Sequence, residues 1–135
     1  DTVFPALTPH FDHRGDTARV ESTRLIRRRT AALAGTEPVV VMGDFNARPD
    51  AQPVQLLTAP DAPVRLRDAR EISETPPHGP PSTYNAFGAC VVKEHRIDYV
   101  FVREGVRVLR HGHLSGRLGA SFPSDHLPVV ADLVF

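Results

Sequence analysis

The apolar residues of this chain fall into short runs separated by polar, proline-rich or glycine-rich stretches. Residues 39–42 are four consecutive apolar residues, three of them valine, and this pattern predicts a buried strand. Residues 96–102 predict a second strong strand, and residues 106–109 and 127–134 predict two weaker ones. Residues 1–9 contain two prolines, so we expect at best an irregular edge strand there.

A longer pattern over residues 17–34 predicts a helix, with Asp16 as its N-cap and Gly35 as its stop. A second, short helix is predicted over residues 52–58. Residues 71–81 hold four prolines and a glycine, which is typical of an exposed loop or flap. The buried face of the first helix is expected to carry Ala18, Ser22, Leu25, Ile26, Ala32 and Leu33.

Composition narrows the class of protein. The chain has 135 residues, 41% of them hydrophobic, which suits one globular α/β domain. Lys+Arg and Asp+Glu number 16 each, so no overall charge marks the chain for nucleic acid or anionic membrane, although a local patch is possible. Cys90 is the single cysteine, which excludes an intrachain disulfide and predicts a buried structural thiol. No signal segment or membrane-length apolar run occurs, which favours the cytoplasm without excluding secretion.

Polar side chains follow the strand predicted over residues 39–42. Gly43 allows a sharp change of direction, and Asp44 and Asn46 come directly after it. Two residues apart in an extended segment, these side chains would point to the same side. A carboxylate beside a carboxamide can orient a water molecule and an anionic oxygen together. An Asx turn, which uses the same residue types, is the alternative interpretation.

Three further places combine ionisable groups with strand ends or strand interiors. Asp98 interrupts an apolar strand, and its burial requires a cation or donor nearby. His126 could be that partner, because a carboxylate on one imidazole nitrogen makes the other nitrogen a better base. The alternative is an ion pair between Asp98 and Arg96. His10 could equally be an exposed loop histidine, and Asp125 with His126 could be a turn before the last strand.

The motifs occur in the order His10, Gly-Asp-Phe-Asn at 43–46, Arg-Ile-Asp-Tyr at 96–99 and Ser-Asp-His-Leu-Pro at 124–128. This order resembles the endonuclease/exonuclease/phosphatase superfamily, which includes the DNase I-like nucleases. The resemblance runs from His10 to the end of the chain and corresponds to the carboxyl-terminal half of the family's domain. It implies half of a four-layer α/β sandwich of the DNase I-like kind, with a mixed, mostly antiparallel sheet flanked by helices.

The resemblance therefore implies a single, amino-terminally truncated domain over residues 1–135. The family's amino-terminal half usually brings a Glu that anchors the metal, and no segment before His10 matches that motif. Half a sandwich is also expected to expose an apolar inner sheet face, which could support a dimer.

The activity implied by the resemblance is hydrolysis of a phosphoester with Mg²⁺ (or Mn²⁺). The substrate could be a small molecule, a phospholipid headgroup or a nucleic acid. The metal would lie at Asp125, directly or through water. A competing interpretation is an inactive family fragment that serves as an interaction or binding module.

The resemblance also implies a role for each remaining site residue. His126, paired with Asp98, would activate the attacking water or stabilise the pentavalent oxyanion. Asp44 would orient that water or act as the base itself. Asn46 would donate to a phosphate oxygen. His10 would stabilise the phosphoryl transition state or help to protonate the leaving group.

Overall fold

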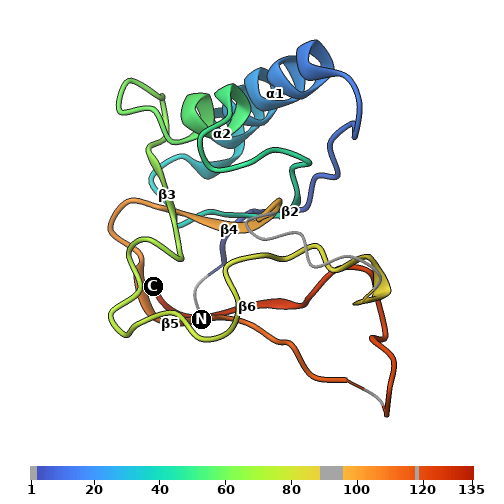
Figure 1. Cartoon of the computed structure of the whole chain (residues 1–135). Coiled ribbons are helices and arrows are strands. Elements are labelled where there is room, and N and C mark those ends of the chain that lie inside the picture. The colour runs from blue at the N-terminus through green and yellow to red at the C-terminus, as the bar shows by residue number, and fades with distance from the viewer. Residues whose placement is uncertain (1–2, 89–95, 118) are drawn as a thin grey trace.

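The protein is arranged in layers in its computed structural model, which describes residues 3–88, 96–117 and 119–135 (Figure 1). Two helices cover one face of a four-stranded sheet, and a two-stranded sheet lies against the other face. The predicted α/β class is confirmed. In chain order the elements are β1 (Ala6–Leu7), α1 (Asp16–Ala34), β2 (Val40–Asp44), α2 (Gln52–Leu57), β3 (Leu66–Asp68), a 3-10 turn (Ala86–Gly88), β4 (Asp98–Arg103), β5 (Arg107–His113) and β6 (Val129–Val134).

The larger sheet has the strand order β1-β2-β4-β3. β1 is parallel to β2, whereas β4 is antiparallel to both β2 and β3, so the sheet is mixed and mostly antiparallel as expected. The register places Asp44 opposite Asp98. Because directly opposite residues on antiparallel strands have neighbouring Cβ atoms, the pairing brings two carboxylates from distant parts of the sequence together.

Gly43 brings the strand of His10 close to β2. Its φ of +152° lies in a region that residues with side chains rarely adopt, and a Cβ atom here would lie 2.2 Å from the Pro9 carbonyl oxygen. The Phe11 amide donates to the Asp44 carbonyl at 2.9 Å, and His10 bridges Asp44 in parallel fashion. Gly43 therefore lets the segment around His10 lie directly against the end of β2.

α1 begins one residue earlier than predicted. Its N-cap is Gly15, not Asp16, because the Asp12 carboxylate accepts the amides of Arg14 and Gly15, each at 2.6 Å, and so sets the turn before the helix. Gly35 ends the helix as predicted.

The predicted buried face of α1 is largely wrong. The helix packs through its small and β-branched side chains: the Thr23 hydroxyl lies within hydrogen-bonding distance of the Arg19 and Pro53 carbonyls, at 3.1 and 3.3 Å. Arginines around the helix obscure the apolar pattern, and the pattern counted the buried threonines as polar. The fully buried residues of α1 are Thr23, Thr30 and Ala34, while the predicted Ala18, Leu25, Ala32 and Leu33 are exposed.

The inner face of the larger sheet is not left bare, contrary to expectation. Val100 and Val102 on β4 are buried beneath β5 and β6, in a cluster that includes Val106 and Val108. The covering strands arise from the chain itself, because β5 continues from β4 after a short turn and turns its own apolar face inward. The exposed residues of this face include Ala6 on β1 and Met42 on β2, which is 39% exposed.

The proline-rich segment 71–81 is not a free flap. It runs beside β5, where Ser73 and His78 form parallel bridges with Val108 and Gly112. Prolines usually interrupt strands, so the sequence pattern did not predict these two isolated bridges. Cys90 lies outside the described residues, so the buried thiol expected at this position stays a prediction. Among the described helices, none is both long and apolar enough to cross a membrane.

Candidate functional site

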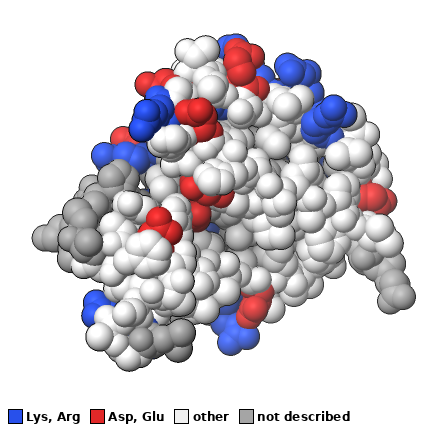
Figure 2. Space-filling model, turned by 90° about the vertical axis from the view of Figure 1, so that its right-hand side faces the viewer, with Lys and Arg blue, Asp and Glu red and all other residues white. Residues whose placement is uncertain are grey.

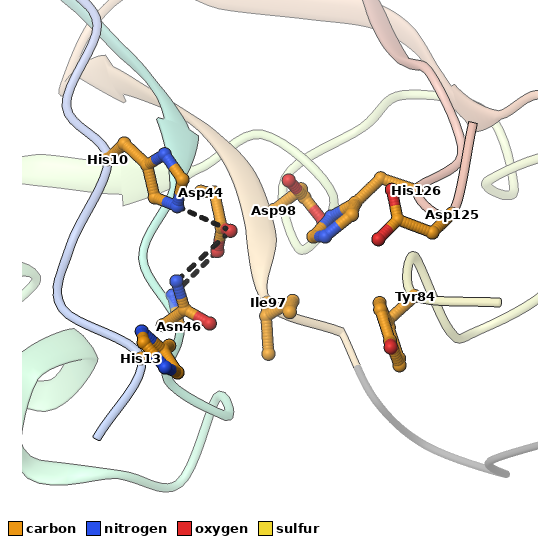
Figure 3. A pocket seen from close by; sticks show the side chains of 9 residues that line it. All are labelled: His10, His13, Asp44, Asn46, Tyr84, Ile97, Asp98, Asp125 and His126. Atoms are coloured by element: carbon orange, nitrogen blue, oxygen red, sulfur yellow. Dashed lines mark hydrogen bonds and ion pairs between the residues drawn. The ribbon is translucent and has the colours of Figure 1, made fainter. Parts of the chain in front are cut away.

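A cavity of about 760 Å³ opens at the end of the larger sheet (Figure 3). Its walls come from the segment after β1, the end of β2, the start of β4, the loop before β6 and the segment before the 3-10 turn. All six residues singled out from the sequence line it, together with three others. The lining residues are His10, His13, Asp44, Asn46, Tyr84, Ile97, Asp98, Asp125 and His126.

Asp98 and His126 form a carboxylate–imidazole pair. His126 Nδ1 lies 2.8 Å from Asp98 Oδ2. A carboxylate accepts, so the proton lies on Nδ1 and the neutral ring leaves its Nε2 lone pair available. The alternative partner Arg96 is engaged elsewhere, with Asp68 at 2.6 Å and Glu71 at 3.4 Å.

The environment of His126 makes its ring a stronger base. Burial by itself lowers the pKa of His126, but the hydrogen bond that it donates to Asp98 and the charges of Asp98, Asp44 and Asp125 outweigh that effect, so the net pKa is raised above the ordinary value. A histidine with a raised pKa and one free ring nitrogen is suited to accept a proton from a water molecule near neutral pH.

Asp44 and Asn46 meet through a turn rather than through an extended segment. Asn46 has a left-handed backbone (φ 44°), and its amide donates to Asp44 Oδ1 at 2.7 Å. Its side-chain Nδ2 donates to Asp44 Oδ2 at 3.1 Å and to the Phe11 carbonyl at 2.9 Å. The Asx turn and the shared site are thus one structure, and both amide hydrogens of Asn46 serve to hold Asp44 and the neighbouring strand.

The Asp44 carboxylate is surrounded by donors yet partly withdrawn from water. His10 Nε2 lies 3.4 Å from Asp44 Oδ2, although the His10 side chain is otherwise 77% exposed. Burial raises the pKa of Asp44, the Asn46 amide opposes that effect, and the nearby Asp98 charge raises the pKa further. Two carboxylates facing each other in this way favour a cation between them.

Three side chains of the site could together hold a metal ion. One ligand atom from each of Asp44, Asp98 and His126 lies within 4.8 Å of the others. Two hard carboxylate oxygens and an imidazole suit a divalent cation such as Mg²⁺ or Mn²⁺, with water completing the shell. Asp125, the ligand expected from the resemblance, is not in this group; its carbonyl instead accepts the amides of Asn85 and Ala86 at 2.7 and 3.2 Å.

Sequence reasoning missed three lining residues as individual site residues. The Tyr84 ring lies edge-on to the His126 ring, with the centroids 5.2 Å apart. Its signal was a short aromatic stretch next to the proline-rich segment. His13 and Ile97 line the cavity because each lies near a chemically active neighbour, and no pattern in the sequence distinguishes them.

Comparison with known proteins shows what this chain is similar to. A model of the endonuclease/exonuclease/phosphatase family matches residues 2–126. No sequence among curated proteins matches the chain. Among solved structures, a mannosyl-6-phosphatase from Bacteroides thetaiotaomicron VPI-5482 is similar, with a TM-score of 0.87 and 31% identity over 96% of this chain and 51% of that one.

Two other solved structures show the range of similarity. A family protein from Bacteroides vulgatus has a TM-score of 0.83 and 30% identity over 93% of this chain and 47% of that one. The human nocturnin catalytic domain shares the fold, with a TM-score of 0.64 and 21% identity over 95% of this chain and 46% of its own. The chain thus spans about half the length of these structures and corresponds to half of the DNase I-like fold.

Proposed function

Because the chain belongs to the endonuclease/exonuclease/phosphatase family, we propose that its site hydrolyses phosphoesters with the help of a divalent cation. The observation that carries the proposal is the Asp98–His126 pair facing Asp44 across one cavity. The similar protein from Bacteroides thetaiotaomicron is a phosphatase, which supports the same class of reaction.

His126 acts on water in this proposal. Asp98 holds the Nδ1 proton, so Nε2 accepts a proton from the attacking water. The imidazolium that results is stabilised by the same carboxylate, and the raised pKa of His126 favours acceptance of that proton. His10, exposed at the opposite wall, is positioned to protonate the leaving oxygen.

Asp44 and Asn46 prepare the site for an anionic substrate. Carboxylate oxygens of Asp44 and Asp98 would hold Mg²⁺ or Mn²⁺, and Asp125 would contribute from the rim through water, while His126 Nε2 stays free to accept a proton. Such an ion would offset the negative charge of the phosphoryl group and the leaving oxygen. Asn46 keeps Asp44 in place, because its amide hydrogens already bond Asp44 and Phe11.

The substrate is proposed to be a small phosphoester rather than a long nucleic acid. On the face shown in Figure 2, acidic and basic side chains are interspersed and form no broad area of one sign. A surface that follows a nucleic acid backbone presents a continuous basic groove. A phospholipid headgroup belongs to the same small-phosphoester class. The competing role, a binding module without turnover, would keep the site and lack hydrolysis.

The test is hydrolysis of bis-p-nitrophenyl phosphate with Mg²⁺ or Mn²⁺. His126→Ala and Asp44→Ala should each lower kcat/KM by roughly 100-fold or more, as for loss of a general base or a metal-binding group. His78→Ala and Asp61→Ala, which lie outside the cavity, are the matched controls. EDTA should abolish turnover, and Mn²⁺ should restore it.

Unchanged turnover in both site variants would contradict the proposal. A folded chain that binds Mn²⁺ at His126, seen as paramagnetic broadening of its NMR signals, but hydrolyses nothing would support the binding-module role instead.

A further inference from the structure

Thr83 connects the two segments that carry the Asp98–His126 pair. Its side chain is completely buried. The Thr83 hydroxyl oxygen accepts the amides of Ile97 and Asp98 at 3.0 and 3.2 Å. Its carbonyl accepts the amide of Leu127, the residue after His126, at 2.7 Å. One residue thus bonds directly to the backbone on both sides of the pair.

This connection matters because Asp98 and His126 belong to different layers. Asp98 is the first residue of β4 in the four-stranded sheet, while His126 precedes β6 in the two-stranded sheet. Among the strands that the structure describes, no ladder of backbone hydrogen bonds joins these two sheets. The separation that allows a 2.8 Å contact between Nδ1 and Oδ2 is therefore set by whatever ties the two strand beginnings together.

The residues after Thr83 strengthen the same connection. Tyr84 forms a backbone bridge with His126 and lies against its ring. The amides of Asn85 and Ala86 donate to the Asp125 carbonyl. These contacts fix the loop of His126 against the segment, but they do not reach β4. The Thr83 hydroxyl extends the connection to the backbone of Asp98 itself.

We propose that Thr83 is a positioning residue: its buried hydroxyl holds the start of β4 at the distance from His126 that the carboxylate–imidazole bond requires. The inference rests on the proposed function only in assigning that bond a role in hydrolysis. A hydroxyl oxygen has two acceptor lone pairs, which matches the two amides it receives. Valine has nearly the same shape as threonine but no hydrogen-bond acceptor. Replacing Thr83 by valine therefore leaves both amides without this acceptor, and the start of β4 can move.

The experiment compares Thr83→Val with Thr83→Ser, which keeps the hydroxyl. The matched control is Thr30→Val, because Thr30 is also buried and its hydroxyl has no hydrogen-bond partner among the described residues. Long-range 1H–15N NMR spectra of labelled protein above the titration range of histidine show which ring nitrogen of His126 carries the proton. This readout needs neither metal nor turnover.

The wild type, Thr83→Ser and Thr30→Val should each show His126 protonated at Nδ1. Thr83→Val should shift His126 toward the Nε2-protonated form that water favours. Where the chain hydrolyses bis-p-nitrophenyl phosphate, Thr83→Val should also lower kcat by about 10- to 100-fold with a much smaller change in KM, as expected for a catalytic pair displaced by about 1 Å. Thr83→Ser should restore most of that loss.

A His126 tautomer unchanged in folded Thr83→Val would overturn the inference, even if activity were lost. If Thr83→Val does not fold, Thr83→Ala takes its place and is judged by the same spectrum. A wild-type chain without turnover would count against the proposed function alone, because the tautomer decides the role of Thr83 separately.

Discussion

The two faces of β4 are packed very differently. Tyr99 and Phe101 point toward the helices and join an aromatic cluster around Phe45, whose ring lies 5.6 and 5.1 Å from theirs, edge-on in both cases. Val100 and Val102 point toward β5 and β6 and meet mostly valine and alanine. One strand thus separates a core of large interlocking rings from a thin aliphatic one.

The candidate site lies where these two cores meet. The aromatic core fixes the end of β2, because Phe45 lies between Asp44 and Asn46 and is completely buried. The aliphatic core carries β6 and hence His126, and a cavity of about 340 Å³ reaches from Met42 to Asp98 along its margin. The difference indicates that one half of the site is held by packing, whereas the other depends on hydrogen bonds such as those of Thr83.

The largest expected effect is on the aromatic side. Phe45→Ala should lower the free energy of unfolding by about 4 kcal/mol, because it removes a fully buried ring and leaves a cavity among three others. Urea denaturation measures this. Phe87→Ala is the control, since that ring is 63% exposed and should change stability by less than about 0.5 kcal/mol. If Phe45→Ala lost no more unfolding free energy than Phe87→Ala, the aromatic core would not dominate the stability of the fold.

The second expected effect is a loss of stability at low pH on the aliphatic side. Burial, together with the charges of His113, Arg70 and Arg96, lowers the pKa of His111 on β5 to about 4. The unfolded chain binds a proton at His111 more readily than the folded chain does. The free energy of unfolding is therefore undiminished above about pH 6.5 and falls by up to about 3 kcal/mol as the pH decreases toward 4.

Urea denaturation at pH 8, 6 and 4.5 tests this expectation, with His111→Leu as the comparison. The variant removes a buried ring whose Nδ1 has no hydrogen-bond partner among the described residues, and it should lose less stability on acidification than the wild type. Identical pH dependence in the two proteins would assign the acid sensitivity to other groups.

The smallest expected effect is a direct probe of the thin core. Val102→Ala should cost about 2 kcal/mol of unfolding free energy, because two buried methyl groups are lost and the small neighbours fill little of the gap. Denaturation at neutral pH measures it beside Phe45→Ala. A cost equal to that of Phe45→Ala would remove the distinction between the two cores.

Much of this arrangement is predictable from the sequence because the signals are local. The runs at residues 39–42 and 96–102 identify the two central strands, and an Asp inside an apolar strand demands a partner. That requirement makes His126 one of two candidate partners for Asp98, beside Arg96, and the structure places His126 Nδ1 2.8 Å from Asp98 Oδ2. The motif order then indicates the family, and the family model matches most of the chain.

The remainder depends on contacts that no local pattern encodes. The left-handed backbone of Asn46 replaces the extended geometry assumed for it, because Asp44 and Phe11 hold it from two directions. In the sequence Thr83 is an ordinary polar residue, and the role proposed for it depends on its hydrogen bonds with two distant amides. The buried face of α1 includes Thr23, whose hydroxyl contacts the Pro53 carbonyl of α2, a contact that the apolar pattern does not encode.

Gly43 has a further consequence for how this protein can vary. Any side chain there would push against the Pro9 carbonyl, and the first thing displaced would be the segment that carries His10. The lack of a Cβ atom at Gly43 therefore preserves the relative position of His10 and Asp44. Sequence libraries that diversify this loop to alter substrate choice should keep position 43 fixed and vary the exposed rim around Tyr84 instead.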